Sequence, residues 1–191
     1  MTMPADLPEE LKKQIGAARD KWGWFVGLGV LLLILGLIAA ANLFVATVAS
    51  VFMVGALMLT AGIIEIVHAF GVKTWQRFFY WFLSGLLYAV AGFFAFYNPV
   101  LASAALTLLL AIALVASGAL RAYFGYAHQG IKNWGWIVAA GVVTALAGIV
   151  IAIGWPVNSL WVLGIFLAID LMIQGWAFVI FGLALRNDSK A

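Results

Sequence analysis

The sequence contains no cysteine and very little charge. Its 191 residues include ten lysines and arginines and seven aspartates and glutamates, so that 9% are charged, whereas roughly a quarter are charged in an ordinary soluble domain. The absence of cysteine excludes disulfide bonds, thiol chemistry and a thiolate metal site. Because 66% of the residues are hydrophobic, too few polar side chains remain to cover a soluble protein of this length.

The sequence has instead six apolar runs, each about 20 residues or longer. They are residues 22–41, 45–70, 78–97, 100–124, 134–153 and 157–185. A helix of about 20 residues, rising 1.5 Å per residue, crosses a hydrocarbon core of roughly 30 Å. Barrel strands are excluded because the runs are too long and do not alternate. The sequence therefore predicts an all-α membrane protein with six transmembrane helices in residues 22–186.

The six runs belong to a repeat of about 56 residues. Glycines recur in three series, Gly29, Gly85 and Gly141, then Gly36, Gly92 and Gly148, then Gly62, Gly118 and Gly175, at intervals of 56 residues or, in the last step, 57. Such a fixed period indicates a duplicated structural unit. With short turns at 42–44, 98–99 and 154–156, it predicts three tandem αα-hairpins, residues 22–77, 78–133 and 134–186, with the two helices of each hairpin packed antiparallel.

The first helix of each predicted hairpin carries two glycines seven residues apart, which form a stripe along one face. The six glycines are Gly29, Gly36, Gly85, Gly92, Gly141 and Gly148. Small residues let helix backbones approach closely, and this approach drives helix association in lipid. We interpret the stripes as packing surfaces that face a common axis. The alternative is that they line a path for a substrate.

The basic residues indicate the orientation of the chain in the membrane. All ten lie near the termini or beside the connections that follow the second and fourth runs, and the turns at 42–44, 98–99 and 154–156 carry none. Positive charge stays on the cytoplasmic side, so both termini are predicted to be cytoplasmic. The net charge of +3 thus reflects topology and gives no reason to expect nucleic acid binding. Residues 1–21 read as a cytoplasmic segment that forms an interfacial amphipathic helix or is simply solvated, and 187–191 as a tail.

Few residues in the spans can carry chemistry, and each is a candidate because charge in a membrane interior is costly. Asp170 lies about thirteen residues from either end of the sixth run, with Gln174 one turn further along the same face. Asp170 is either the partner of a buried cation or part of a proton or ion relay. Glu65 and Arg121 are related by the repeat and are expected to pair, with Asp170 as a competing partner for Arg121. Alternatively, Arg121 reaches the head groups unaided.

The two histidines and the known catalytic motifs point to no metal site and no enzyme. His68 follows Glu65 at i+3, which makes it either a pH-responsive neighbour of that carboxylate or a residue of the membrane interface. With His128 far away, the two histidines lack the spacing of metal ligands. No Walker loop, dinucleotide fingerprint, zinc-protease helix or nucleophile elbow with a triad is present. We therefore expect no metal, no cofactor and no enzymatic activity.

Three segments carry a resemblance to a known family. They are Gly-Ile-Ile-Glu-Ile-Val-His-Ala-Phe at 62–70, Gly-Ala-Leu-Arg at 118–121 and Gly-Ile-Phe-Leu-Ala-Ile-Asp at 164–170. Together with the three two-helix repeats, they resemble the HdeD family of small bacterial inner-membrane proteins, built from a short repeat of unknown function. The resemblance covers roughly residues 22–186. It implies a role in acid resistance, notably at high cell density, without catalytic activity, and it supplies no established binding residues.

The leading hypothesis is therefore a non-enzymatic protein of the bacterial inner membrane that helps cells withstand acid. A second hypothesis is a small channel or transporter with Asp170, Gln174 and Glu65 along its path. A third is an assembly subunit whose glycine stripes and lipid-facing surface bind another membrane protein. The lipid bilayer is the expected partner, homo-oligomers are compatible with all three hypotheses, and the sequence does not identify a protein partner.

Overall fold

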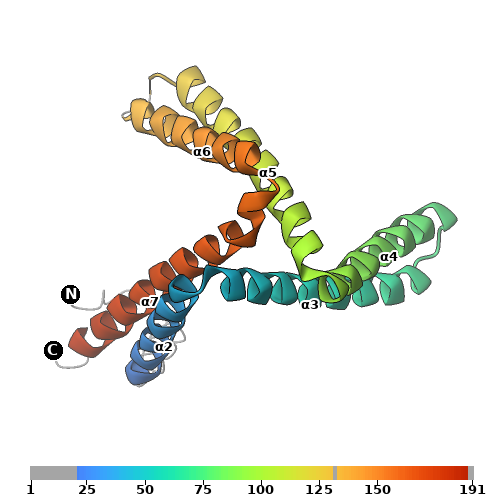
Figure 1. Ribbon diagram of the computed structural model, residues 1–191, viewed down its shortest axis with the longest axis horizontal. Helices are drawn as coiled ribbons and strands as arrows, with labels where there is room; N and C mark the ends of the chain where they lie inside the picture. Colours follow the sequence, from blue (N-terminus) through green and yellow to red (C-terminus); the bar gives the residue numbers. More distant parts are fainter. Residues whose placement is uncertain (1–20, 131–132, 189–191) are drawn as a thin grey trace, which may run out of the picture. The chain divides into compact units, whose positions relative to one another are not determined.

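The computed structural model describes residues 21–130 and 133–188, which are helical apart from short connections (Figure 1). The helices are α2 (Trp22–Ala41), α3 (Leu43–Phe70), α4 (Trp75–Tyr97), α5 (Pro99–Ala127), α6 (Trp134–Gly154) and α7 (Val162–Asp188), with the short 3-10 helix η1 (Val157–Leu160) before α7. All six α-helices are long and apolar enough to cross a membrane, which confirms the predicted class. The predicted N-terminal interfacial helix and the end of the predicted tail lie outside the described residues.

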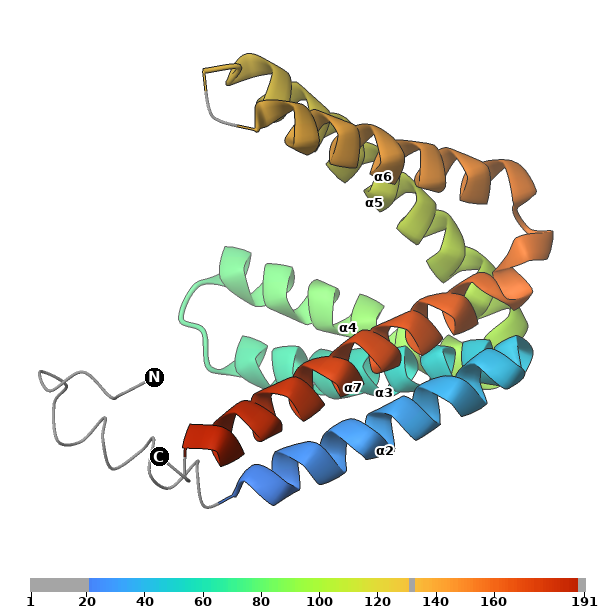
Figure 2. The same ribbon diagram turned by 90° about the vertical axis from the view of Figure 1, so that its left-hand side faces the viewer.

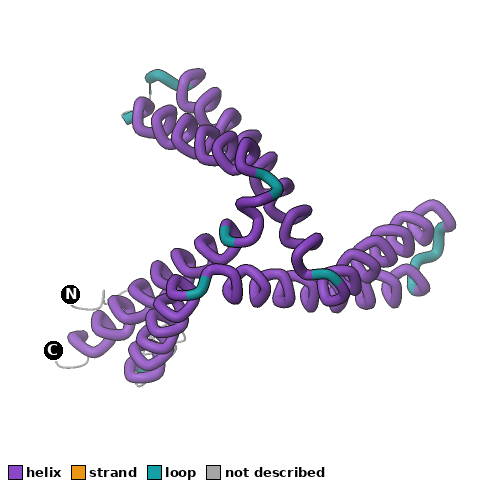
Figure 3. Tube along the Cα trace, in the orientation of Figure 1, coloured by secondary structure: helices purple, strands orange, loops and turns teal. Residues whose placement is uncertain are grey.

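The predicted turn at 98–99 is confirmed, and one residue explains how short it is. The backbone N–H of Asn98 donates to the carbonyl oxygen of Phe94 (2.9 Å) and ends α4. Its side-chain Oδ1 accepts from the N–H of Leu101 (3.1 Å), and Pro99 occupies the first position of α5. A side-chain cap followed by proline satisfies the free donors of a helix start, so α5 begins directly after α4 (Figure 3).

We expected the sixth apolar run to form one continuous helix, and this expectation was wrong. Residues 157–160 form η1, and α7 begins at Val162. The Asn158 side chain explains part of this break, since its Nδ2 donates to the carbonyl oxygen of Ile151 near the end of α6 (2.7 Å). The N–H of Gly164 donates to Oγ1 of Thr47 on α3 (2.9 Å). The chain between α6 and α7 is thus held by polar contacts that hydrophobicity alone does not reveal.

The chain divides into two compact units. One contains α2 and α7 from Ile165 onward, and the other extends from Leu43 to Gly164 and contains α3, α4, α5, α6 and η1. In the second unit α3 packs along α4 and α5 packs along α6 (Figures 1 and 2). In the first unit α2 packs along α7. The protein is therefore built from three long helix pairs.

A seam of small residues holds α3 against α4. A Cβ atom built on Gly62 would lie 2.5 Å from the amide nitrogen of Ala89 and 2.6 Å from the carbonyl oxygen of Gly85. One built on Gly92 would lie 2.7 Å from the carbonyl oxygen of Gly55. These distances are too short for any side chain, so glycine is what permits the two backbones to touch.

The other two pairs repeat this seam. A Cβ atom on Gly141 of α6 would lie 2.7 Å from the carbonyl oxygen of Gly118 on α5, and one on Gly29 of α2 would lie 2.7 Å from that of Gly175 on α7. Each pair therefore joins the second helix of one predicted hairpin to the first helix of the next, and α7 returns to α2. The predicted stripe glycines do pack helices, as their burial shows.

Two details of the expected packing were wrong. Each glycine stripe faces a single neighbouring helix and not a common axis. In addition, α4 and α5 share a very short turn but contact each other far less than α4 contacts α3 or α5 contacts α6. The reason is register: Gly85 and Gly92 match Gly62 and Gly55 on α3, so close contact along α3 outweighs the proximity that the turn imposes.

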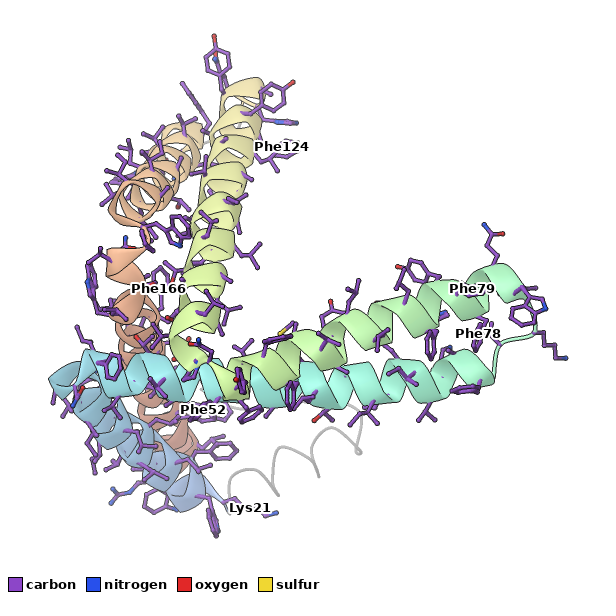
Figure 4. The ribbon with its side chains drawn as sticks, turned by 45° about the vertical axis from the view of Figure 1, so that its right-hand side comes forward. Lys21, Phe52, Phe78, Phe79, Phe124 and Phe166 are labelled. Carbon is purple, nitrogen blue, oxygen red and sulfur yellow. The ribbon has the colours of Figure 1, made fainter. Side chains whose placement is uncertain are left out.

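Aromatic rings cover the end of the α3/α4 pair near its connecting segment 71–74. Phe70 lies edge-on to Phe78, with ring centroids 5.6 Å apart, and Trp75 lies 5.8 Å from Phe79. Figure 4 shows Phe78 and Phe79 at this end of α4, and Phe52 toward the other end of α3. Aromatic rings are typical of the level at which helices leave the hydrocarbon, which indicates that this end of the pair lies near a membrane surface.

Candidate functional site

Glu65 is the ionisable residue that the structure places most directly in a helix contact. It lies on α3 beside the seam. A Cβ atom built on Gly85 of α4 would lie 2.9 Å from the Cβ atom of Glu65. The side chain as a whole is half-buried, but its Oε2 atom is buried and has no hydrogen-bond partner within the described part of the chain. An unpaired buried carboxylate oxygen is costly and marks this position as a candidate site.

His68 lies one turn further along the same side of α3 and contacts α4. Its ring is edge-on to that of Trp81, with centroids 4.9 Å apart and planes at 73°. Residues three apart on a helix share a face, so Glu65 and His68 occupy the same flank of the α3/α4 pair. The two residues share a face, as their spacing predicts, and no hydrogen bond joins them in the described structure. The pH-responsive role of His68 stays a prediction.

A groove continues along this flank beyond Glu65. It has a volume of about 430 Å³ and is lined by Met58 of α3 and by Ser84, Leu87, Tyr88 and Ala91 of α4. Met58 lies seven residues before Glu65, close to two turns, so the groove and the carboxylate share one side of the pair. We call the set Met58, Glu65, His68, Trp81, Ser84 and Tyr88 the polar flank.

The repeat supplies an internal comparison for the polar flank. The position of Glu65 recurs as Arg121 on α5 and Phe178 on α7, and that of Trp81 corresponds to Phe25 on α2. In the α2/α7 pair Phe25 stacks on Phe178, with centroids 6.3 Å apart, and lies edge-on to a second ring of α7, with centroids 5.2 Å apart. Apolar rings therefore suffice to pack this position, so the carboxylate at 65 is not required by the fold.

The expected ion pair between Glu65 and Arg121 is absent from residues 21–130 and 133–188. Both residues belong to the unit that extends from Leu43 to Gly164, but Glu65 lies beside α4, whereas Arg121 is exposed on α5. Positions related by the repeat lie at the same place on different pairs and so need not meet. The alternative that the Arg121 side chain reaches the lipid head groups unaided agrees with its exposure. A pairing of Arg121 with Asp170, which lies in the other unit, stays a prediction.

Asp170 and Gln174 are brought together as expected. Gln174 Nε2 donates to Asp170 Oδ2 over 2.6 Å, and both side chains are exposed. Ala168 and Gly175 of α7 face α2, and Asp170, two residues after Ala168, lies on the far side of the helix. Because α7 begins at Val162, Asp170 lies eight residues, or about 12 Å, from the helix start. This is nearer to the end of the helix than the expected thirteen residues, but it is still close to half the thickness of a hydrocarbon core.

The structure contains a cluster of buried hydroxyl groups that the sequence did not predict. Where α3, α5 and η1 meet, Thr47, Ser103, Thr107 and Ser159 are almost wholly buried. Most bond to backbone groups, but Oγ1 of Thr107 has no partner among the described residues, and neither has Oδ1 of Asn158. The available signal was the grouping of serine and threonine in the first halves of the second and fourth runs. Across the described residues, no three His, Asp or Glu side chains are placed to hold a metal ion.

Six apolar helices joined in glycine-packed pairs define a multi-pass helical membrane protein. Within that class, the chain belongs to the family described as a short repeat of unknown function (DUF308), which matches residues 27–97 and 83–153. The two matches begin and end 56 residues apart, which confirms the internal repeat. No curated protein and no solved structure matches the chain.

Each family match spans three consecutive helices. The first runs from within α2 to the end of α4, and the second from within α4 to near the end of α6. The last two helices of each match form one of the glycine-packed pairs, α3/α4 or α5/α6. The family pattern therefore contains a complete pair together with the helix that precedes it.

Proposed function

We propose that this chain is a non-enzymatic protein of the bacterial inner membrane, with both termini in the cytoplasm, that helps cells survive acid. The resemblance to the HdeD family suggests the acid-linked role, and membership of the short-repeat family is compatible with it. The observation that carries the proposal is the internal comparison between Glu65 and Phe178. A carboxylate stands at membrane depth where the same fold packs with phenylalanine, so its presence points to a function beyond packing.

The arrangement suits a response to protons. Glu65, His68 and Asp170 are the acidic and imidazole side chains of the spans, and these residue types form the proton relays of membrane proteins. The atoms nearest to the glycines that hold the helix pairs include the Cβ of Glu65 but no carboxyl or imidazole atom of these three residues.

The test is survival of a deletion strain after acid challenge, complemented with wild type, Glu65→Gln, Asp170→Asn or Arg121→Gln at equal membrane levels. We expect wild type to restore survival and Glu65→Gln to restore it only in part. Failure of the wild type to restore survival would refute the acid-resistance role. Full rescue by both carboxylate variants would leave that role standing but refute the part assigned to these side chains.

A second candidate is an assembly subunit, and the placement of Asp170 favours it. Asp170 and Gln174 form a hydrogen-bonded polar pair on the side of α7 that faces away from α2. Polar side chains at membrane depth are stabilised by facing protein or water and not lipid. A stoichiometric membrane partner that co-purifies with wild type and is lost from Asp170→Asn would support this function; co-purification unaffected by that substitution would count against it.

A further inference from the structure

The polar flank of the α3/α4 pair combines three recognition elements. Glu65 supplies a carboxylate with a buried, unpartnered oxygen. Trp81 supplies an indole ring on the same flank, held by His68. The adjoining groove of about 430 Å³ supplies an apolar wall of Met58, Leu87 and Ala91 with two hydroxyl-bearing residues, Ser84 and Tyr88. Its volume lies within the range of pockets that hold small organic molecules, about 300–1,000 Å³.

These elements define the chemistry of a ligand. A carboxylate without a donor calls for a positive charge and N–H donors, and an aromatic ring on the same flank favours a cation. The apolar groove calls for a hydrocarbon or aromatic body, which is also what lets a molecule enter from the bilayer. Anions are disfavoured by Glu65, and small inorganic cations would leave the apolar groove unfilled.

We propose that the polar flank binds a lipophilic ammonium ion, a protonated amine with an apolar body, whose charged head pairs with Glu65. The ammonium group donates to the Glu65 carboxylate beside the Trp81 ring, and the apolar body lies in the groove between Met58 and Tyr88. Because the Glu65 side chain as a whole is only half-buried although Oε2 is buried, the head group pairs with the carboxylate from its exposed side, and α3 and α4 stay in contact. The site is complete within one helix pair of one chain.

The repeat explains why only this pair would form such a site. At the position of Glu65 the α5/α6 pair carries Arg121, which repels a cation, and the α2/α7 pair carries Phe178, whose ring is occupied by stacking on Phe25. The remaining carboxylate of the spans, Asp170, is engaged by Gln174 and lines none of the described grooves. Asp170 and Arg121 are therefore matched controls for Glu65.

The first experiment measures binding by titration calorimetry in phosphatidylcholine nanodiscs at neutral pH. The probe is naphthylethylammonium, and naphthylethanol is its neutral analogue of nearly equal shape. We expect wild type to bind the ammonium at least about tenfold more tightly than the alcohol, as one charge-assisted contact provides. Empty nanodiscs measure the partitioning of each probe into lipid. Equal affinity for the two probes would refute the proposal.

Substitutions test whether Glu65 is the residue that binds the ammonium group. Glu65→Gln, which keeps the shape and removes the charge, is expected to lose the preference for the ammonium, whereas Asp170→Asn and Arg121→Gln keep the affinity within about twofold. Retained binding by a folded Glu65→Gln protein would overturn the proposal. So would a loss of binding in Asp170→Asn equal to that in Glu65→Gln.

A second measurement uses the wild-type chain and does not depend on the folding of any variant. Dicyclohexylcarbodiimide is an apolar reagent for carboxyl groups in membranes. The carboxyl O–H adds across a C=N bond, its proton passes to nitrogen, and acyl migration leaves a stable N-acylurea without a leaving group. We expect labelling of Glu65, mapped by mass spectrometry, to be suppressed by naphthylethylammonium and not by naphthylethanol, while labelling of Asp170 is unaffected. Equal protection by both probes, or none by either, would refute the site.

Discussion

Substituting Gly62 by alanine tests the contact on which the α3/α4 pair depends. The added methyl group would lie 2.5 Å from the amide nitrogen of Ala89 and 2.6 Å from the carbonyl oxygen of Gly85. Both are backbone atoms of α4, so neither can rotate away. Because ordinary contacts of carbon atoms are about 3.5–4.0 Å, the two backbones must separate locally by about 1 Å.

The cost follows from that separation. A radial gap of about 0.5–1 Å forfeits a quarter to a half of each affected van der Waals contact, and an extra methyl group in a well-packed interface costs about 1–3 kcal/mol. Alanine also favours a helix over glycine by about 1 kcal/mol. Gly27→Ala measures this propensity alone, since a Cβ atom there would meet nothing within 4 Å. The free energy of unfolding of Gly62→Ala should therefore be about 1–3 kcal/mol lower than that of Gly27→Ala.

The assay is reversible unfolding in mixed micelles at increasing dodecyl sulfate, followed by tryptophan fluorescence and circular dichroism. Gly118→Ala should resemble Gly62→Ala, because its nearest contacts are also backbone atoms of the neighbouring helix. Gly175→Ala should cost less, since its nearest atoms lie at 2.8 and 2.9 Å and one belongs to the Leu33 side chain. Equal shifts for Gly62→Ala and Gly27→Ala would refute the seam.

Three further predictions test the structure elsewhere. Thr47→Val should destabilise the protein by about 1–2 kcal/mol because the N–H of Gly164 loses its acceptor. Thr107→Val removes a hydroxyl without a partner in the described residues and should be neutral or stabilising. The reverse order of stability in chemical denaturation would contradict this prediction. Cysteines at positions 25 and 181, where the two phenylalanine ring centroids lie 5.2 Å apart, should be joined by a short bismaleimide cross-linker that keeps the two ends of the chain together after proteolysis. Two separate fragments would contradict the α2/α7 pair. A fluorescent protein fused to the C-terminus should be active and alkaline phosphatase inactive, and the opposite result would overturn the cytoplasmic placement of the termini.

The sequence by itself determined the class, the number of spans and the repeat. Each is a local or periodic property: run length against hydrocarbon thickness, and glycines at a fixed interval. The turn at Asn98 and Pro99 could also be predicted from the sequence, because helix capping depends on residues that are neighbours in sequence. The hydrogen bond between Gln174 and Asp170 likewise follows from the spacing of one helical turn.

Only the tertiary structure decided which helices pair. The repeat in the sequence identified most glycines of the seams, although not Gly55. The turns suggested that α4 lies along α5, and the structure places α4 along α3. The register of two stripes on different helices is a relation between distant residues, so it cannot be read from either helix alone. The same holds for Glu65, whose expected partner Arg121 lies on another pair, while the glycine at 85 gives it room beside α4.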